Sequence, residues 1–359
     1  MSKIRCGVIG AGWWASFAHL PALRKHGGAE LVALQKGDLE RARKMVADFD
    51  VPHAFNTTEE MLESVELDAV VISSTPNVHY EQAKRVLEAG KHLLIEKPMT
   101  IRADEARELM AIADRSGLEV VVSCPWHYTA HGLETRRRIR GGELGRVKVI
   151  SVLMTNPIDR LLRGIDTTPT HGGESYIEPR EGSYKDPSIA GGGQVYCQVP
   201  HTAAYLSYLT GCSPAEVFAR FDFDNSPNDI YDVLSLQMRS GPSVSIATTA
   251  ATPEAERNYE VRIYGSEAIM FLELWKGTMS VITMKGERED VNPLDTEAIY
   301  PHEAPAVNLI DVLRGEAENH SPGWLGVAAM DVTEAACDSA RDNRNVAIEP
   351  PSAALGGKA

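Results

Sequence analysis

The first fifteen residues constrain the fold more than any other part of this chain. The apolar run Ile4–Ile9 predicts a buried strand, and the Gly-Ala-Gly turn behind it leads into a helix that begins near Trp14. Gly10 permits the tight turn, Gly12 lets the backbone come close to a pyrophosphate, and Ala15 is small enough for the helix to pack on the strand. Since the amides of a helix N-terminus attract phosphate, the segment predicts a dinucleotide-binding turn.

After this turn, short apolar runs alternate with helical segments. The first helix extends to about Lys25, and Pro21 is expected to bend or break it. The predicted strands are 30–34, 69–73, 92–96 and 119–123, and the predicted helices are 39–48, 78–89 and 102–116. Alternating strands and helices are typical of a doubly wound parallel sheet, which is the setting that a dinucleotide site requires.

From Ala215 onward, alternating strands follow one another with short turns, which predicts a mostly antiparallel sheet. The predicted strands are 216–223, 231–239, 244–250, 259–264, 269–275 and 279–284, and the predicted helices are 304–314 and 325–342. The predicted fold class is therefore α/β. An N-terminal Rossmann domain covers residues 1–124, a C-terminal α+β domain with a large open sheet covers 125–349, and 350–359 form a loose tail.

Composition excludes several classes of partner. The chain of 359 residues has a net charge of −14, which disfavours nucleic acid and anionic membrane surfaces. Its five cysteines have no metal-ligand spacing, so we expect free thiols and no metal. No signal peptide precedes the first strand and no apolar run is long enough to span a bilayer, so we expect a cytoplasmic protein.

The end of the second strand bears on the cofactor. NAD-binding folds usually place an acid there to hold the ribose 2′-hydroxyl, but this chain has Lys36, followed by Arg41. Cations at this position favour a 2′-phosphate, and therefore NADP. The alternative is that Lys36 is solvated and that Gln35 or Asp38 binds the ribose of NAD.

Two loops follow strands at their carboxyl ends, where ligands bind in such sheets. The first is the segment from Ser74 to His79, in which Pro76 rigidifies the loop and Asn77 can cap the next helix; a purely structural turn is the alternative. The second is Glu96-Lys97-Pro98, in which the lysine can reach a substrate hydroxyl beside a nicotinamide. The candidate cofactor-binding residues are Gly10, Gly12, Trp13, Trp14, Lys36, Arg41, Ser74, Thr75, Pro76, Asn77, His79, Glu96 and Lys97.

The order of these motifs resembles the glucose–fructose oxidoreductase and inositol dehydrogenase family (Gfo/Idh/MocA). The motifs that carry the resemblance are Gly10-Ala-Gly12, Thr75-Pro-Asn77 with His79, and Glu96-Lys97-Pro98. The resemblance implies an enzyme that uses NAD(H) or NADP(H) to oxidise or reduce a carbinol of a sugar or polyol. It also implies that Lys97 is catalytic, whereas cofactor choice does not carry over because of Lys36.

The start of the second domain, Cys124-Pro-Trp126-His127-Tyr128, corresponds to a linker that lines the substrate pocket in the family. The resemblance implies that Trp126 and Tyr128 stack on a sugar ring and that His127 forms a hydrogen bond with it. An aromatic core at a hinge is the alternative. The basic segment 133–140 that follows is expected to be the solvated face of a helix.

The second candidate catalytic residue is His201, which follows a run of three glycines at 191–193. Cys197 lies four residues earlier, so both are expected on one helical face. Many relatives carry an Asp and a His at this spacing. Here His201 matches and Cys197 does not, and a thiol is a poor substitute for a carboxylate. Tyr196, Gln198 or His127 is expected to compensate; a buried structural histidine is the alternative.

The long segment 156–193 has little periodicity and carries Arg160, Arg163, Arg180 and Lys185. Arg163, which lies between apolar residues and a glycine, is the preferred contact for an anionic substrate. The alternative is that these cations bridge subunits or face water.

These observations lead to one function and two alternatives. The expected protein is an NAD(P)-dependent sugar or polyol dehydrogenase in which Lys97 and His201 handle the hydroxyl proton. The first alternative is an oxidoreductive glycoside hydrolase that oxidises, eliminates, hydrates and reduces in turn. The second is a non-catalytic dinucleotide-binding regulator. By the resemblance, the open face of the second sheet is expected to form a homodimer or homotetramer.

Overall fold

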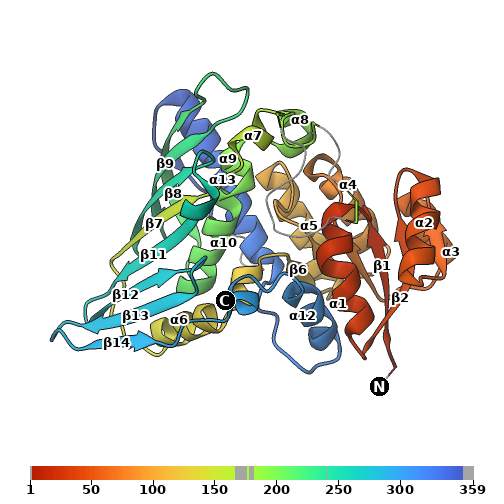
Figure 1. The fold of residues 1–359 in the computed structure, drawn as a ribbon, viewed down its shortest axis with the longest axis horizontal. Helices are drawn as coiled ribbons and strands as arrows, with labels where there is room; N and C mark the ends of the chain where they lie inside the picture. The colour runs from red at the N-terminus through yellow and green to blue at the C-terminus, as the bar shows by residue number, and fades with distance from the viewer. Residues whose placement is uncertain (1, 166–175, 178–181, 240, 351–359) are drawn as a thin grey trace. The chain divides into compact units, whose positions relative to one another are not determined.

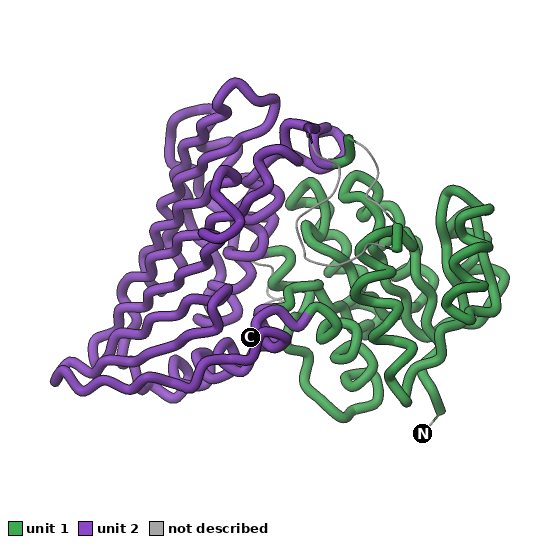
Figure 2. Tube along the Cα trace, viewed as in Figure 1, with its two compact units in different colours: residues 1–125, 172–183, 302–327 green, residues 126–171, 184–301, 328–359 purple. Residues whose placement is uncertain are grey.

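The computed structural model describes residues 2–165, 176–177, 182–239 and 241–350 (Figure 1). Arg180 and most of the predicted tail lie outside these residues. The chain divides into two compact units (Figure 2). Unit 1 comprises residues 1–125, the described part of 172–183, and 302–327, and unit 2 comprises the remainder. Both units are discontinuous in sequence, whereas the sequence suggested a single boundary near residue 124.

Unit 1 contains a parallel sheet that, in the described residues, has six strands in the order β3-β2-β1-β4-β5-β6. This is the Rossmann order. The strands are β1 (Ile4–Ile9), β2 (Ala29–Gln35), β3 (His53–Phe55), β4 (Ala69–Ile72), β5 (His92–Ile95) and β6 (Val120–Val122). All residues of β4 are buried, as its continuous apolar run predicts for a sheet covered on both faces. The short edge strand β3 was not predicted.

The helices of unit 1 follow the sequence closely. They are η1 (Ala15–His19), α1 (Leu20–Lys25), α2 (Leu39–Phe49), α3 (Thr58–Ser64), α4 (Pro76–Glu88), α5 (Ala103–Ser116) and α12 (Ala304–Leu313). Asp38 caps α2 and Thr57 caps α3, each by accepting a backbone N–H. Helix α5 ends at Gly117, which has a positive φ of 64°. Buried residues of α12 join the core that β1 and α1 form.

The helix is interrupted beside Pro21, where the π-helical turn η1 gives way to the regular helix α1. The turn before it, η1, is a π-helix in which the amide of Leu20 donates to the carbonyl of Ala15, five residues earlier. In a regular α-helix the proline ring clashes with the carbonyl four residues before it. The wider turn accommodates the ring, and Pro21 then occupies the first turn of α1, where no amide donor is needed.

Unit 2 contains a sheet that has nine strands among the described residues, in the order β14-β13-β12-β11-β7-β10-β9-β8-β15. Neighbouring strands are antiparallel except β7 and β10. The strands are β7 (Val149–Thr155), β8 (Pro214–Asp222), β9 (Tyr231–Met238), β10 (Ser243–Thr249), β11 (Asn258–Tyr264), β12 (Ala268–Glu273), β13 (Thr278–Thr283), β14 (Arg288–Val291) and β15 (Val346–Ala347). The predicted fold class, with a mostly antiparallel second sheet, is confirmed.

The remaining helices lie in unit 2, apart from η2 and α13, which cross the division between the units. They are η2 (Pro125–Tyr128), α6 (Ala130–Arg140), α7 (Asp159–Leu162), α8 (Pro187–Ala190), α9 (Gln194–Cys197), α10 (Val199–Thr210), η3 (Glu254–Glu256), α11 (Thr296–Ile299) and α13 (Gly323–Asp342). Helices α6 and α10 cover one face of the sheet (Figure 1). No described helix is both long enough and apolar enough to cross a membrane.

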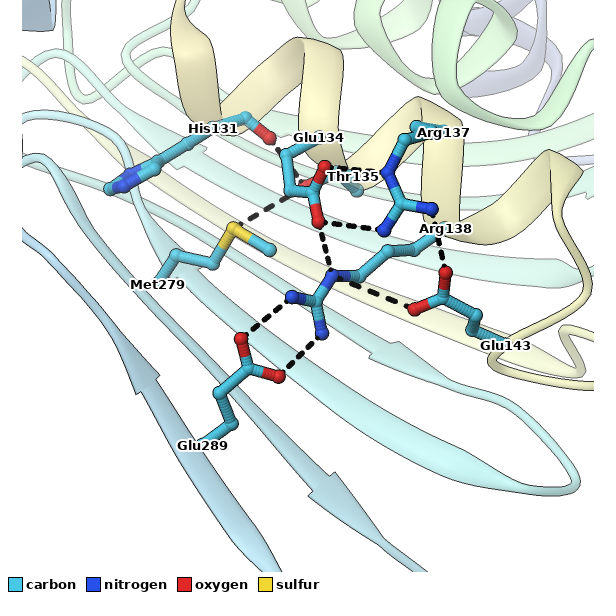
Figure 3. Close-up of polar contacts among 8 residues, drawn as sticks. All are labelled: His131, Glu134, Thr135, Arg137, Arg138, Glu143, Met279 and Glu289. Atoms are coloured by element: carbon cyan, nitrogen blue, oxygen red, sulfur yellow. Dashed lines mark hydrogen bonds and ion pairs between the residues drawn. The ribbon is translucent and has the colours of Figure 1, made fainter.

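The basic helix α6 is only partly the solvated face that its sequence predicts (Figure 3). Arg137 is exposed, but the side chain of Arg138 is only 12% exposed. Both terminal nitrogens of Arg138 donate to the carboxylate of Glu289 on β14, at 2.8 and 2.7 Å, and its Nε donates to Glu134 at 2.7 Å. This bidentate pair ties the edge strand β14 to the helix.

Candidate functional site

The glycine turn of unit 1 has the geometry that a dinucleotide requires. Gly10 has a φ of +72°, and a Cβ there would lie 2.5 Å from the backbone of Ser74, so no side chain fits. A Cβ at Gly12 would make only ordinary van der Waals contacts, with the carbonyl of Gly10 at 3.5 Å and Nζ of Lys36 at 3.9 Å. The protein itself would therefore tolerate alanine at position 12. A ligand that approaches the backbone closely, as a pyrophosphate does, explains the glycine.

Lys36 lies at this turn and does not point into solvent. Its Nζ donates to the carbonyl of Ala11 at 3.0 Å and lies 3.9 Å from the position of a Cβ on Gly12. Burial lowers the pKa of the Lys36 ammonium, and the nearby charge of Arg41 lowers it further. The structure thus places a cation directly at the predicted nucleotide turn.

The two alternative ribose ligands already have other partners. Gln35 accepts a hydrogen bond from the amide of Gly10 at 3.2 Å and donates to the carbonyl of Asn56 at 2.7 Å. Asp38 accepts from the amide of Arg41 as the N-cap of α2 and forms an ion pair with the Arg41 side chain at 3.3 Å. Gln35 thus holds the glycine turn and Asp38 holds the start of α2, while Lys36 holds the carbonyl of Ala11.

The loop from Ser74 to His79 is held by its own side chains. Thr75 precedes α4, Pro76 is the first residue of that helix, and the hydroxyl of Thr75 donates to Asn77 Oδ1 at 2.7 Å. The ring of His79 is buried between the carbonyl of Pro98, 2.9 Å from Nδ1, and that of Ser74, 3.0 Å from Nε2. Burial lowers the pKa of His79. The ring therefore connects this loop to the one that contains Lys97.

Glu96 lies in a network of hydrogen bonds beside Lys97. It is 8% exposed, and its Oε1 accepts from the indole N–H of Trp14 at 2.7 Å and lies 2.8 Å from Nε2 of His19. Its Oε2 accepts from the backbone amide of Lys97 at 3.2 Å. His19 was not singled out in the sequence, because a lone histidine near a proline gives no signal.

In unit 2, Trp126 lies in an aromatic cluster. Its ring centroid is 5.1 Å from that of His201, 4.9 Å from Tyr259, 5.2 Å from Trp275 and 4.7 Å from Tyr300. The tryptophan is only 3% exposed. These contacts favour the aromatic-core alternative for Trp126, and they place the core directly against His201.

His127 also belongs to a packed core. It is fully buried, and its ring stacks on Tyr208 at a centroid distance of 4.6 Å and an interplanar angle of 5°. Tyr128, the next residue, is half-buried. Of the linker residues, Tyr128 is therefore the one whose exposure suits contact with a ligand.

The predicted single helical face of Cys197 and His201 is wrong. Helix α9 ends at Cys197, Gln198 has a non-helical backbone conformation, and a second helix, α10, starts at Val199 with Pro200 in its first turn. Proline has no amide hydrogen to donate within a helix, so it is tolerated in the first turn of a helix but not in the middle of one. Pro200 therefore suits the start of α10. Cys197 packs with apolar residues such as Ile158 and Ile230 and is 8% exposed.

Tyr196 explains the glycine run before it. A Cβ at Gly191 would lie 2.4 Å from the Tyr196 ring, and one at Gly192 would lie 2.7 Å from it. Tyr196 is 7% exposed, and burial raises the pKa of its hydroxyl. The glycines therefore make room for an aromatic ring.

Arg163 has partners within unit 2. Its Nε donates to Asp159 at 2.6 Å, and its two terminal nitrogens donate to the carbonyl and carboxylate of Asp224 at 2.9 and 2.7 Å. All three guanidinium nitrogens are thus engaged by the protein. This arrangement favours a structural ion pair over recognition of an anionic substrate, and it matches neither of the alternatives drawn from the sequence.

Comparison with protein families agrees with this geometry. Residues 4–124 match the model of the oxidoreductase family with an NAD-binding Rossmann fold, and residues 133–271 match the GFO/IDH/MocA C-terminal domain. The chain belongs to the Gfo/Idh/MocA family of oxidoreductases. Its cofactor is therefore NAD(H) or NADP(H), and the resemblance found in the sequence is confirmed.

Individual members of the Gfo/Idh/MocA family match this chain over different lengths. An uncharacterized oxidoreductase, sll0816, of Synechocystis sp. is 32% identical over 217 residues, so the match spans 60% of this chain and about half (53%) of that protein. A 1,5-anhydro-D-fructose reductase of Ensifer adhaerens is 25% identical over 352 residues, covering 96% of this chain and 98% of the reductase.

A solved structure shows the same fold over nearly the full length. It is the WlbA dehydrogenase from Bordetella pertussis in complex with NADH and UDP-GlcNAcA, with a TM-score of 0.76 and 22% identity. The match covers 97% of this chain and 99% of that one. At this identity the likeness establishes the fold of the Gfo/Idh/MocA chain described here.

Proposed function

We propose that the protein is an NAD(P)-dependent dehydrogenase or reductase that acts on a carbinol of a sugar, sugar derivative or polyol. The observation that carries the proposal is the Lys97 loop. It follows β5 at the carboxyl end of the parallel sheet, and the buried carboxylate of Glu96 holds the Lys97 amide. The sugar-related names of the Ensifer reductase and the Bordetella dehydrogenase support this substrate class.

Two side chains are proposed to handle the proton of the substrate hydroxyl. The bound nicotinamide supplies a hydride acceptor or donor. Lys97 receives or returns the hydroxyl proton and stabilises the developing alkoxide, and His201 assists it. His201 suits a supporting role, because it is 5% exposed and is held edge-on by Trp126.

NADP is the proposed cofactor of the two. Lys36 lies on the glycine turn, and Arg41 is in the first turn of α2, so both cations follow β2 where the ribose 2′-position is read in Rossmann folds. Guanidinium and ammonium groups bind a phosphate, whereas the usual acid binds a free hydroxyl.

A second copy of the chain is the proposed partner of the open face of the nine-stranded sheet. On this face Val233, Ala247 and Leu153 are cross-strand neighbours on β9, β10 and β7, and Val233 is 60% exposed. Such a row of apolar side chains is typical of a protein–protein interface. Sedimentation of Val233→Asp tests it: the variant is expected to be monomeric while the wild type is a dimer or tetramer. A monomeric wild type contradicts the proposal.

The function itself is tested by absorbance at the reduced-nicotinamide band, with NAD and NADP each offered with a panel of polyols, sugars and glycosides. A dehydrogenase accumulates the reduced cofactor in proportion to the substrate oxidised. An oxidoreductive glycosidase releases the aglycone without net reduction, and a regulator does neither while still binding dinucleotide. Net reduction of the cofactor by at least one sugar or polyol, or net oxidation of the reduced cofactor by a keto sugar, supports the proposal, and the absence of both contradicts it.

A further inference from the structure

The carboxylate of Glu96 is held by two residues that a regular helix would not bring together. Trp14 and His19 are five residues apart at the start of the first helix, and both contact Oε1 of Glu96, at 2.7 and 2.8 Å. In an α-helix, residues five apart lie about 140° apart around the axis. The π-helical turn η1 lies between them and contains one more residue per turn, which reduces that angle.

The contact with Glu96 is also what orients His19. The imidazole is fully buried, and among the described residues its Nδ1 has no hydrogen-bond partner. The Nε2 contact is therefore its polar anchor. Loss of this contact would leave the buried imidazole without its polar partner, which costs stability.

Glu96 in turn fixes the loop that carries Lys97. Its second oxygen accepts from the Lys97 amide, so the carboxylate bridges the nucleotide-side helix and the backbone of this loop. Among the other titratable groups, the charge of Lys97 lowers the pKa of Glu96, and the charge of Glu96 in turn raises the pKa values of His79 on α4 and Cys124 after β6. Burial acts to raise the pKa of Glu96, but the pKa is lowered overall, because His19 donates to the carboxylate and stabilises its charge.

We propose that Trp14 and His19 are positioning residues. Through Glu96, they hold the backbone of Lys97 in the orientation that its proton transfer requires, and the π-turn exists to bring them onto one carboxylate. The proposal rests on the role of Lys97 proposed above. It assigns no contact with substrate to either residue, and it links the first helix of the dinucleotide site to the Lys97 loop.

The test compares His19→Leu with the conservative His19→Gln, whose amide can still donate to Glu96. A positioning role predicts that His19→Leu lowers kcat by about tenfold or more, because small misplacements of a catalytic group are costly. Dinucleotide Kd, measured by fluorescence titration, is expected to change by less than about threefold, and His19→Gln is expected to regain most of the lost kcat. Trp14→Phe, which removes the N–H donor but keeps an aromatic ring, is expected to behave like His19→Leu.

A second readout needs no turnover. In protein labelled with ¹⁵N-lysine, hydrogen exchange of the Lys97 amide is expected to speed up in His19→Leu and to remain slow in His19→Gln. The matched control is His26→Leu, which removes another histidine–carboxylate contact of unit 1, 2.9 Å from Asp311. This control is expected to leave both kcat and the Lys97 amide unchanged.

The outcomes separate this proposal from the proposed function. If Lys97→Met abolishes turnover but His19→Leu keeps wild-type kcat and slow Lys97 exchange, the positioning role is wrong and the function stands. If His19→Leu and His19→Gln lose the same amount of kcat and show equal falls in Tm, the positioning role is also wrong. If Lys97→Met itself turns over normally, the proposed function of the lysine is wrong.

Discussion

Two buried carboxyl groups, Glu96 in unit 1 and Asp232 in unit 2, have pKa values that are shifted in opposite directions. Glu96 is surrounded by donors, from Trp14, His19 and the Lys97 amide, and its pKa is lowered. Asp232 is 1% exposed, and burial together with the neighbouring Asp229 raises its pKa to about 10. Burial alone does not decide the charge of a carboxyl group; its partners do.

The difference has a functional meaning. Asp229 accepts from the amides of Gly193 and Val195, at 3.0 and 2.6 Å, so the acid pair holds the glycine run ahead of α9. Because Asp232 keeps its proton, the two carboxyl groups share one proton and together carry at most one negative charge. The acid pair therefore serves the scaffold of unit 2, whereas the charged Glu96 serves the loop of Lys97.

The largest expected effect is on stability, from Asp232→Asn. An acid whose pKa is raised in the folded state, from 3.8 to about 10, keeps a proton that the unfolded chain releases, so the wild type loses stability as pH rises through this range. An asparagine amide can donate to Asp229 without titrating. Its free energy of unfolding is expected to exceed that of the wild type by an amount that grows up to about 4 kcal/mol from pH 5 to pH 8. Parallel pH profiles of the two proteins in urea unfolding would contradict the assignment.

Glu96→Gln is expected to lower the free energy of unfolding, whereas Asp232→Asn raises it. The pKa of Glu96 is lowered on folding, so its charge stabilises the native state above the unfolded value of 4.5, and this contribution is lost as pH falls through the folded pKa. At pH 7 the variant is expected to be less stable by about 1–2 kcal/mol, the scale of a charged hydrogen bond. Urea unfolding at pH 7 and pH 3 measures this difference in the free energy of unfolding between the wild type and the variant. The difference is expected to be smaller at pH 3. A larger difference at pH 3 would show that the carboxyl is neutral.

The smallest of these effects concerns the cofactor. Lys36→Asp is expected to lower the preference for NADP over NAD by about tenfold, because a carboxylate repels the 2′-phosphate and accepts the 2′-hydroxyl. The ratio of the two Kd values, from fluorescence titration of the reduced cofactors, is the measurement. Asp38→Asn, at the N-cap of α2, is the control. An unchanged ratio in Lys36→Asp would show that the lysine does not meet the cofactor.

Much of unit 1 could be predicted because its pattern is local. Alternating apolar runs and helix caps are sequence signals, and the seven strands and helices predicted between residues 30 and 123 all begin and end within two residues of the observed ones. The edge strand His53–Phe55 was missed because three residues carry no periodicity. The π-turn was missed because Pro21 signals a disturbed helix but not which disturbance.

The candidate sites were harder to predict because they depend on partners distant in sequence. Spacing placed Cys197 and His201 on one helix, but spacing cannot show the restart that Pro200 permits. Arg163 looked available because its partner Asp224 lies 61 residues away. Likewise His19 becomes notable only when Glu96, 77 residues later, is placed against it.

The proton-transfer role of Lys97 is tested by absorbance at the reduced-nicotinamide band for the wild type and Lys97→Met, with NADP or NAD and the best sugar or polyol of the panel. The wild type is expected to show net reduction and Lys97→Met a turnover at least ~10²-fold lower, the scale of acid–base catalysis, with dinucleotide binding retained. Near wild-type turnover in a folded Lys97→Met variant that binds dinucleotide normally would contradict this role.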